Sequence, residues 1–207
     1  MGKIFYVMGK SSSGKDTIYN KLIMDRELKL KTFVGYTTRP MREGEADGRE
    51  YFFVDKKRLD ALKGEGRVIE VREYDTIHGI WYYFTVDDEQ VDLTSHSYIL
   101  IGTLESYEKV RDYYGTKVVV PVYINVEDGE RLSRALARER MQKEPGYEEL
   151  CRRFLADAKD FSRDRIEHLG INTIYENVYM EECYNRIKAD IIKEMHHVEH
   201  GSEVKEN

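Results

Sequence analysis

The fold is decided by the stretch Gly9-Lys-Ser-Ser-Ser-Gly14-Lys15, because of the segments on either side of it. Residues 3–8 before it are apolar and rich in β-branched and aromatic side chains, which indicates a buried strand. Residues 17–28 after it have helical spacing, with apolar residues on one face. A strand, a glycine loop and a helix in this order form the first half of a βαβ unit. Spacing and context together predict a P-loop.

This loop predicts how a phosphate is held. Glycines let consecutive backbone N–H groups turn inward on the phosphates, and the following helix adds the positive end of its dipole. We expect Lys15 to reach the β- and γ-phosphates of ATP as a point charge. The alternative is a Gly/Ser-rich turn without a ligand. The residues expected to bind ATP here are Gly9, Ser11, Ser12, Ser13, Gly14, Lys15, Asp16 and Thr17.

The residue after Lys15 departs from the usual motif. A serine or threonine that binds magnesium usually stands there, whereas this chain has Asp16 and places the hydroxyl one position later, at Thr17. A carboxylate at that point either ligates Mg²⁺ or repels the triphosphate. We expect Mg²⁺ to bind with ATP, and Asp16 and Thr17 are the candidate ligands.

The remaining apolar pattern predicts a parallel sheet with two excursions. Residues 97–101 and 116–124 are continuous apolar runs, as expected for central parallel strands covered on both faces. Residues 103–114 between them suit a crossover helix, and residues 33–91 suggest a small mixed insert. The further elements expected are strands at 51–54, 81–85 and 172–175, and helices at 56–62, at 127–160 with a break at 144–146, and at 181–197.

Composition and charge limit the classes to which the protein can belong. The 207 residues favour one globular domain with small inserts. A net charge of −6 argues against a general nucleic-acid partner, since a polyanion is bound through a basic excess. Cys151 and Cys183 are expected to lie unpaired in helices. No stretch suits a signal peptide or a membrane span, so the expected location is cytoplasmic, with no membrane partner.

A second motif follows the P-loop. It reads Tyr36-Thr-Thr-Arg39-Pro-Met-Arg42-Glu-Gly44-Glu-Ala-Asp-Gly48-Arg-Glu-Tyr51-Phe-Phe53 and closely resembles the signature of the guanylate kinase family. With weaker matches beyond it, the resemblance covers almost the whole chain. It implies an α/β fold of the P-loop nucleoside monophosphate (NMP) kinase type. The parts expected are a parallel-sheet core of residues 1–33, 97–126 and 157–197, a mixed α+β GMP-binding insert of 34–96, a helical lid of 127–156 and a disordered tail of 198–207.

The resemblance also assigns the acceptor nucleotide. Two guanidiniums can hold a phosphate dianion through paired, charge-assisted hydrogen bonds, and tyrosine hydroxyls complete such a site. The carboxylate of Glu70 matches the family's guanine-reading acid, which accepts from the N1–H and the 2-amino group together. Thr85 stands where the family has a hydroxyl near the guanine O6. The residues expected to bind GMP are Arg39, Arg42, Tyr51, Glu70, Tyr83 and Thr85.

Arginines of the expected lid resemble those that close over the transferred phosphoryl group. Arg134 and Arg138 are four residues apart and therefore share a helix face, and Arg153 follows after the break. Such arginines stabilise the charge that spreads in the transition state. Their register stays open, because Arg131 and Arg140 are close rivals, and a basic helix is often only a solvated one. The catalytic residues expected are Lys15, Arg39, Arg134, Arg138 and Arg153, and Asn177 is expected to touch the adenine.

Several positions depart from the family pattern. Gly35 replaces a serine that helps to hold the base, Phe84 replaces a glycine, and the loop at residues 75–80 reads a few residues long. Family members that catalyse carry an Asp-x-Asp at the end of a central strand, where this chain has Ile101 and Thr103. Asp16 and Glu105 are the candidates for the missing charge.

The function predicted is a guanylate kinase that transfers the γ-phosphoryl group of ATP to GMP and gives GDP and ADP. One alternative is a catalytically weak or inactive module that uses the same cleft to bind nucleotides or phosphoproteins. The presence of Lys15 favours the enzyme, because such modules typically lack this lysine. A second alternative is an NMP kinase with a changed base preference. Monomer and homodimer both stay open.

Overall fold

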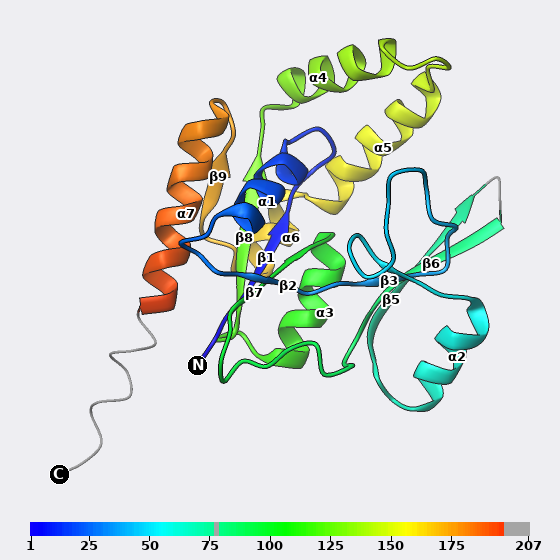
Figure 1. The fold of residues 1–207 in the computed structure, drawn as a ribbon. Helices are drawn as coiled ribbons and strands as arrows, with labels where there is room; N and C mark the ends of the chain where they lie inside the picture. The colour runs from blue at the N-terminus through cyan, green and yellow to red at the C-terminus, as the bar shows by residue number, and fades with distance from the viewer. Residues whose placement is uncertain (77–78, 197–207) are drawn as a thin grey trace.

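The computed structural model describes residues 1–76 and 79–196, and its core is a five-stranded sheet (Figure 1). Every neighbouring pair of strands in it is parallel. Because β1 is central, the loop after it leaves from the carboxyl edge of the sheet, where α/β folds bind their ligands. In spatial order the strands are β2 (Lys31–Thr32), β7 (Tyr98–Ile101), β1 (Ile4–Met8), β8 (Val119–Asn125) and β9 (Ile174–Glu176).

Helices cover both faces of this sheet. All five residues of β1 are at most 1% exposed, so alternate side chains contact opposite helical layers. The continuous apolar strands and their double cover are those that the sequence predicts, and the α/β fold class is confirmed. One layer consists of α1 (Lys15–Met24) and α7 (Met180–His196), and the other of α3 (Leu104–Tyr114) and α6 (Arg163–His168).

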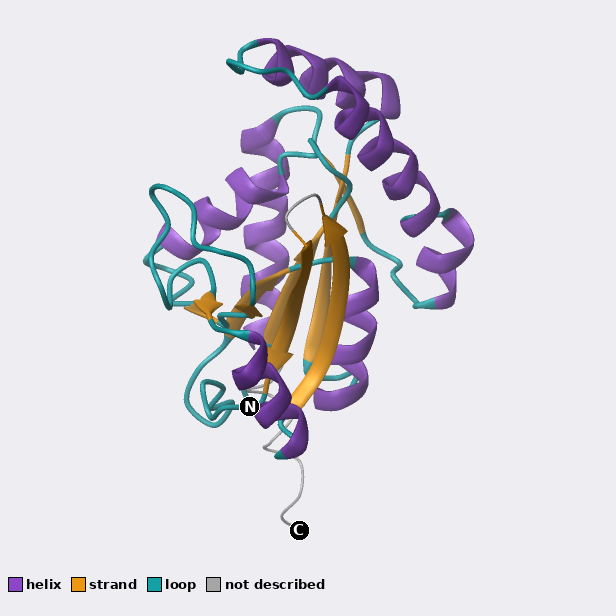
Figure 2. Ribbon diagram, turned by 90° about the vertical axis from the view of Figure 1, so that its right-hand side faces the viewer, coloured by secondary structure: helices purple, strands orange, loops and turns teal. Residues whose placement is uncertain are grey.

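A second, smaller sheet forms the predicted mixed insert, to the right of the core in Figure 1 and facing the viewer in Figure 2. The two strands at one edge, residues 52–53 and 36–37, are parallel, and the other neighbouring pairs are antiparallel. The helix α2 (Lys56–Gly64) begins at Asp55, whose side chain accepts from Arg58 N, and packs Leu59 and Leu62 against the sheet. The strands are β4 (Phe52–Phe53), β3 (Tyr36–Thr37), β6 (Gly79–Val86) and β5 (Val68–Thr76).

Two helices, α4 (Asp128–Arg140) and α5 (Tyr147–Asp160), form an arm at the top of Figure 1. The helical structure is interrupted between them, at Glu144-Pro-Gly146, as predicted. The Gly146 N–H donates to Glu139 Oε1 at 2.6 Å. The predicted boundary between lid and core at residue 156 falls inside α5, which continues to Asp160. The helical arm itself is the excursion that the basic sequence indicates.

Some element boundaries were predicted wrongly. The helix expected at residues 17–28 begins at Lys15 and ends at Met24, because Asp25 turns the chain and ties its carboxylate to Tyr184 and Lys188. The long loop expected at residues 75–80 is shorter, because residues 75–76 end β5 and residues 79–80 begin β6. Residues 77–78 and the predicted tail lie outside the described part of the chain. β2, β3, β5 and α6 were not predicted.

Two smaller expectations concern cysteines and membranes. Cys151 lies exposed on α5 and Cys183 lies buried on α7, and both are free thiols, as predicted. Within residues 1–76 and 79–196, none of the helices combines the length and the apolar character that crossing a bilayer requires.

Candidate active site

The predicted P-loop is a tight turn between β1 and α1, and close contacts require two of its glycines. Gly14 has φ 82° and is the N-cap residue of α1, a left-handed conformation that favours glycine. A Cβ there would lie 2.4 Å from the side-chain nitrogen of Asn177. A Cβ at Gly9 would lie 2.4 Å from the carbonyl oxygen of Ile124. The loop is therefore held against β8 and against the segment that follows β9.

Polar groups of this loop have capacity left for a ligand. The hydroxyls of Ser12 and Ser13 are buried and have no hydrogen-bond partner in the described part of the chain. Such groups are rare in folded proteins and call for an explanation. Lys15 is the first residue of α1, so its ammonium and the positive end of the helix lie together. These features suit an anion, as a P-loop does.

Asp16 and Thr17 stand on the first turn of α1. Asp16 Oδ2 lies 3.1 Å from the Lys15 ammonium, and its side chain is 76% exposed. Mg²⁺ typically keeps several waters and binds one or two carboxylates together with substrate phosphates. In the described residues no group of three or more His, Cys, Asp or Glu side chains is arranged to hold a metal ion. Asp16 and Thr17 together offer one carboxylate and one hydroxyl, which fits a magnesium ion that arrives with a nucleotide, and both remain predicted ligands.

Asn177 follows β9 and supports the loop from behind. It is 1% exposed, its Nδ2 donates to the Ser13 carbonyl at 2.8 Å, and its backbone N–H donates to the Asn125 carbonyl at 2.8 Å. Arg134 donates from Nη2 to the Asn177 carbonyl at 3.3 Å. One of the two amide N–H groups of Asn177 is thus bonded to the protein, and the adenine contact stays a prediction.

The helical arm brings basic residues to the P-loop. Arg138 and Arg153 line one small cavity together with Ser11 and Ser12. The Nε of Arg153 is buried and has no hydrogen-bond partner among the described residues; the nearest acid, Glu149, is 3.7 Å away. Two of the three predicted lid arginines therefore face the loop, and Arg134 faces the segment that supports it.

Arg131, a rival in the sequence prediction, ties the arm to the loop instead. It is 1% exposed, and its Nη1 lies 3.0 Å from Asp157 Oδ2 and donates to the Ser11 carbonyl at 3.3 Å. Asp157 also accepts from the Ser11 N–H at 2.8 Å. A second link joins Lys10 to Asp128 at 3.1 Å, and Asp128 also pairs with Arg131. The other rival, Arg140, lies exposed on α4.

Arg39, predicted to bind the acceptor phosphate, is a buried residue of the insert. It is 4% exposed, and its guanidinium donates to both carboxylate oxygens of Glu45, at 2.7 and 2.5 Å. These hydrogen bonds lower the pKa of Glu45 to about 2. The Nε of Arg39 is buried and has no partner among the described residues. Arg42 is exposed and contacts Glu45 through its backbone N–H at 2.7 Å.

Aromatic rings surround this guanidinium. Its centre lies 5.4 Å from the Tyr51 ring and 5.3 Å from the Phe53 ring, within the range of cation–π attraction. Tyr51 and Tyr83 contact each other edge to face at 5.5 Å. Burial raises the pKa of the Tyr51 hydroxyl, which therefore stays protonated and able to donate. The structure thus brings Arg39, Tyr51 and Tyr83 together and leaves Arg42 at the rim.

Glu70 and Thr85 lie opposite each other on β5 and β6. The Thr85 hydroxyl donates to Glu70 Oε1 at 2.7 Å, so the structure brings these two predicted residues together. Arg72 was missed by the sequence reasoning, yet its Nε and Nη2 donate to the same carboxylate at 3.0 and 3.2 Å. The spacing of two residues along a strand was the available signal, because such residues share a face.

At the end of β7 the chain has Ile101 and Thr103 at the two positions where the resemblance implies acids. Thr103 is the N-cap of α3 and forms a capping box with Ser106. Ser106 also bonds the Tyr6 hydroxyl at 2.5 Å. A Cβ at Gly102 would lie 2.1 Å from that hydroxyl, so the residue between Ile101 and Thr103 must be glycine while Tyr6 is there. Tyr6 was treated only as a strand residue in the prediction.

The core and the insert share one pocket at this edge. Its core wall includes Tyr6, Tyr19 and Gly102, and its insert wall includes Tyr51 and Arg72. The replacements Gly35 and Phe84 also line it, and the Phe84 ring stacks on Tyr36 at 5.3 Å.

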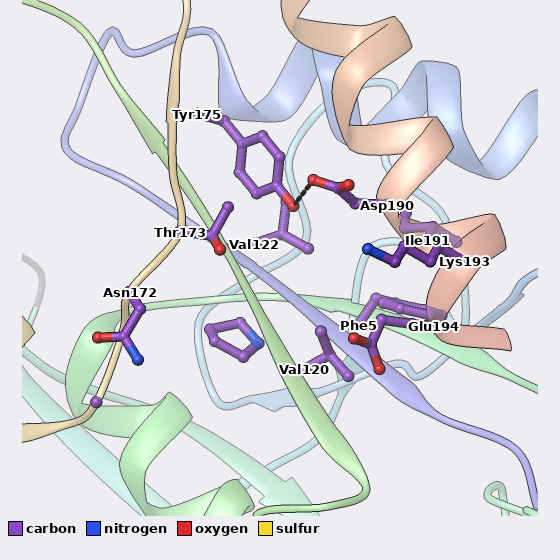
Figure 3. A pocket seen from close by; sticks show the side chains of 12 residues that line it. Phe5, Val120, Val122, Asn172, Thr173, Tyr175, Asp190, Ile191, Lys193 and Glu194 are labelled. Carbon is purple, nitrogen blue, oxygen red and sulfur yellow. Dashed lines mark hydrogen bonds between the residues drawn. The ribbon is translucent and has the colours of Figure 1, made fainter. Parts of the chain in front are cut away.

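A separate pocket of about 340 Å³ lies between β8 and α7 (Figure 3). Its walls include Phe5 and Val122, and the Tyr175 hydroxyl donates across it to Asp190 at 2.9 Å. None of the predicted site residues lines it. Some of the predicted residues instead line the pocket shared by core and insert or the small cavity at the P-loop, as Tyr51 and Arg153 do.

The amino-acid sequence is similar to those of known proteins. The family model described as guanylate kinase matches residues 1–194. A guanylate kinase of Cupriavidus pinatubonensis is 26% identical over 194 residues, which cover 91% of this chain and 83% of that protein. A guanylate kinase of Bradyrhizobium diazoefficiens is 42% identical over 69 residues, which cover 33% of this chain and 31% of that protein.

A solved structure is also similar. The crystal structure of guanylate kinase from Anaplasma phagocytophilum aligns with a TM-score of 0.64 and 22% identity, and the alignment covers 93% of this chain and 86% of that one. At this identity the likeness concerns the fold, and it agrees with the parallel-sheet core described above.

Proposed function

The chain belongs to the guanylate kinase family, and we propose that it transfers the γ-phosphoryl group of ATP to GMP, giving ADP and GDP. The observation that carries the proposal is that polar groups with capacity for a phosphate occur both in the P-loop and in the insert. In the P-loop are Lys15 and the Ser12 and Ser13 hydroxyls, which have no hydrogen-bond partner within residues 1–76 and 79–196. In the insert is the buried Arg39, whose Nε likewise has no partner in that part of the chain. A phosphotransferase needs a site for each of its two phosphates.

Catalysis in this proposal is positioning and charge, without a covalent intermediate. The P-loop and Lys15 hold the donor phosphates. Arg39, Tyr51 and Tyr83 hold the acceptor phosphate, with Arg42 closing from the rim. Arg138 and Arg153 approach from the helical arm and stabilise the charge on the phosphoryl group as it moves.

Magnesium, when bound, neutralises phosphate charge and orients the triphosphate. Asp16 and Thr17 are the residues of this chain that would hold it, because they stand beside Lys15 on the first turn of α1. The pKa of the Tyr51 hydroxyl is raised mainly by burial and by Tyr83, and the Asp16 charge adds to this shift.

A second candidate function is a binding module without turnover. Ile101 and Thr103 favour it, because they stand where the resemblance places the acids of catalysing relatives. The intact P-loop favours the enzyme, since a module that binds only an acceptor phosphate has no need of a donor site.

Steady-state ADP release with ATP, Mg²⁺ and GMP, for the natural chain and Lys15→Ala, tests the proposal. We expect turnover with GMP and a loss of roughly 10²–10³-fold in Lys15→Ala, the size measured for one transition-state donor. Lys21→Ala is the matched control, since Lys21 stands on the same helix and pairs with Glu181 away from the loop. ATP and GMP binding without any ADP release would support the module instead.

A further inference from the structure

Arg72 stands between Glu70 and the pocket shared by core and insert. That pocket is lined by Arg72 and Thr85 but not by Glu70. The Glu70 side chain is 3% exposed, whereas that of Arg72 is 15% exposed. A ligand that enters from the cleft therefore meets the guanidinium before the carboxylate.

Glu70 has little capacity left for a ligand. Its Oε1 accepts from Arg72 Nη2 and from the Thr85 hydroxyl, and its Oε2 accepts from Arg72 Nε. An ionised carboxylate has about four acceptor positions, so a single position on Oε2 is left. Guanine presents two neighbouring donors, the N1–H and the 2-amino group. Glu70 cannot accept from both while Arg72 stays in place.

Arg72, in contrast, has donors to spare. Burial opposes its charge, but the adjacent Glu70 carboxylate outweighs burial and raises the pKa of Arg72, so the guanidinium stays charged. Of its five N–H groups, two go to Glu70. Even with one more directed at the neighbouring Tyr74 hydroxyl, two have no partner among residues 1–76 and 79–196 and are available to a ligand.

The second carboxylate at this pocket does not replace Glu70. Glu50 lines the pocket wall, but its Oε2 accepts from the Ala46 N–H at 2.8 Å and its Oε1 accepts from Arg49 Nε at 2.6 Å. These bonds fold it into the charged turn before β4. Of Glu50, Glu70 and Arg72, the group with most capacity left for a ligand is therefore the donor Arg72 rather than a carboxylate.

We propose that Arg72 selects the acceptor base by donating a hydrogen bond to the oxygen at C6 of a 6-oxopurine. The inference rests on the proposed function and deepens it. Guanine and hypoxanthine both carry this oxygen, whereas adenine carries an amino group that cannot accept. The 2-amino group, which distinguishes guanine from hypoxanthine, meets no free carboxylate. The acceptors are then 6-oxopurine nucleoside monophosphates as a class, with Glu70 positioning Arg72.

Calorimetric binding of GMP, IMP and AMP to the full chain tests this, together with kcat/KM for the same nucleotides with ATP and Mg²⁺. For the natural chain we expect GMP and IMP within about threefold of each other and AMP at least about tenfold weaker. For Arg72→Ala we expect the preference for GMP over IMP to rise at least about tenfold. The uncovered Glu70 then accepts from the 2-amino group, and a hydrogen bond to a charged group contributes that much.

Arg72→Lys is the second variant, because it keeps a positive charge beside Glu70 if Arg72→Ala fails to fold. A lysine contacts one carboxylate oxygen, so the same shift is expected at about threefold. Arg58→Ala is the matched control: Arg58 lies exposed on α2 of the same insert and pairs with Glu65. It should leave the ratio of GMP to IMP unchanged.

A natural chain that prefers GMP over IMP by more than about tenfold overturns the inference. So does a ratio that neither Arg72 variant changes, or the absence of binding of all three nucleotides. The expected binding ratios without turnover of any nucleotide would refute the proposed function and leave the role of Arg72 in recognition supported.

Discussion

The proposed donor side and the proposed base side of the site differ in the groups that form them. The donor side is mostly backbone: a glycine loop held by Asn177 and by the ion pair of Arg131 with Asp157. The base side is mostly side chains: Glu70, Arg72 and Thr85 on two adjacent strands. A backbone site tolerates changes around it as long as the loop keeps its shape, because its donors are the same in every residue. A side-chain site changes its ligand when one residue changes.

This difference explains how the chain keeps a P-loop while its base pocket departs from the family pattern. Phosphate groups are common to all nucleotides, so the donor site has one task. Base recognition depends on single hydrogen bonds, and a polar group without a partner costs enough to change specificity. The predictions below test whether the donor side is held by its network and whether the acceptor side depends on single residues.

The largest effect on stability is expected for Arg131→Leu. Removing one partner of a buried ion pair leaves the other unpaired. Asp157 is 17% exposed at its side chain and keeps some solvation, so we expect a loss of about 2–3 kcal/mol in the free energy of unfolding, measured by denaturant titration. The double variant with Asp157→Ala should recover part of this. Equal or greater loss in the double variant would show that the pair does not hold the arm to the loop.

A large effect on activity is expected for Arg39→Ala. Because Arg39 is buried among Tyr51, Phe53 and Glu45, its loss should lower kcat/KM for GMP by roughly 100-fold. The KM for ATP should change little. Arg42→Ala, at the exposed rim, is the control, with a loss of roughly tenfold. Equal losses for the two arginines would contradict the idea that one buried residue dominates the acceptor side.

A smaller effect is expected from pH. The carboxyl of Glu45 has its pKa lowered from 4.5 to about 2 by Arg39. A group with a lower pKa in the folded chain stabilises the fold above its unfolded pKa, and this contribution is lost as the pH falls through the folded value. From about pH 6.5 to about pH 3.5, the stability advantage of the natural chain over Glu45→Gln should shrink by about 1 kcal/mol, measured by urea unfolding at each pH. An advantage that grows on acidification would contradict the ion pair.

The smallest effect is expected at the surface of the arm. Arg152→Ala removes an exposed ion pair with Glu149, and its effect on unfolding should be within about 0.5 kcal/mol. Activity should also be unchanged, because Arg152 is not among the residues that line the cavity at the P-loop. A tenfold loss of activity would mean that Arg152, rather than Arg153, faces the phosphoryl group.

The sequence predicts what is contiguous in the chain. β1 and the P-loop are one continuous pattern, and the buried runs of β7 and β8 are visible because both of their faces are covered. β2 and β3 are two residues long each, which is too short to show the alternation of apolar and polar residues that indicates a strand. β5 carries four charged residues among its nine, four of its nine residues are exposed, and its strand character comes from pairing with β6.

Within the site, the same limit decides what was missed. Lys15, Arg39 and Glu70 belong to recognisable motifs, so they could be named in advance. Asp157 and Ser11 lie 146 residues apart, and no local pattern joins them. Arg72 was within reach of a strand argument, but its contact with Glu70 depends on a strand that was not predicted. Tyr6 looked like a core residue until its hydroxyl was seen at Ser106.

The most direct test of the central claim is to follow the γ-phosphoryl group itself. The full chain is incubated with ATP labelled at the γ-phosphate, Mg²⁺ and GMP, and the nucleotides are separated by chromatography. Transfer between the two phosphate sites of one cleft predicts the label on GDP, and Lys15→Ala should lose it. Label that stays on ATP, or appears only as inorganic phosphate, would contradict the claim that this cleft joins a donor to an acceptor.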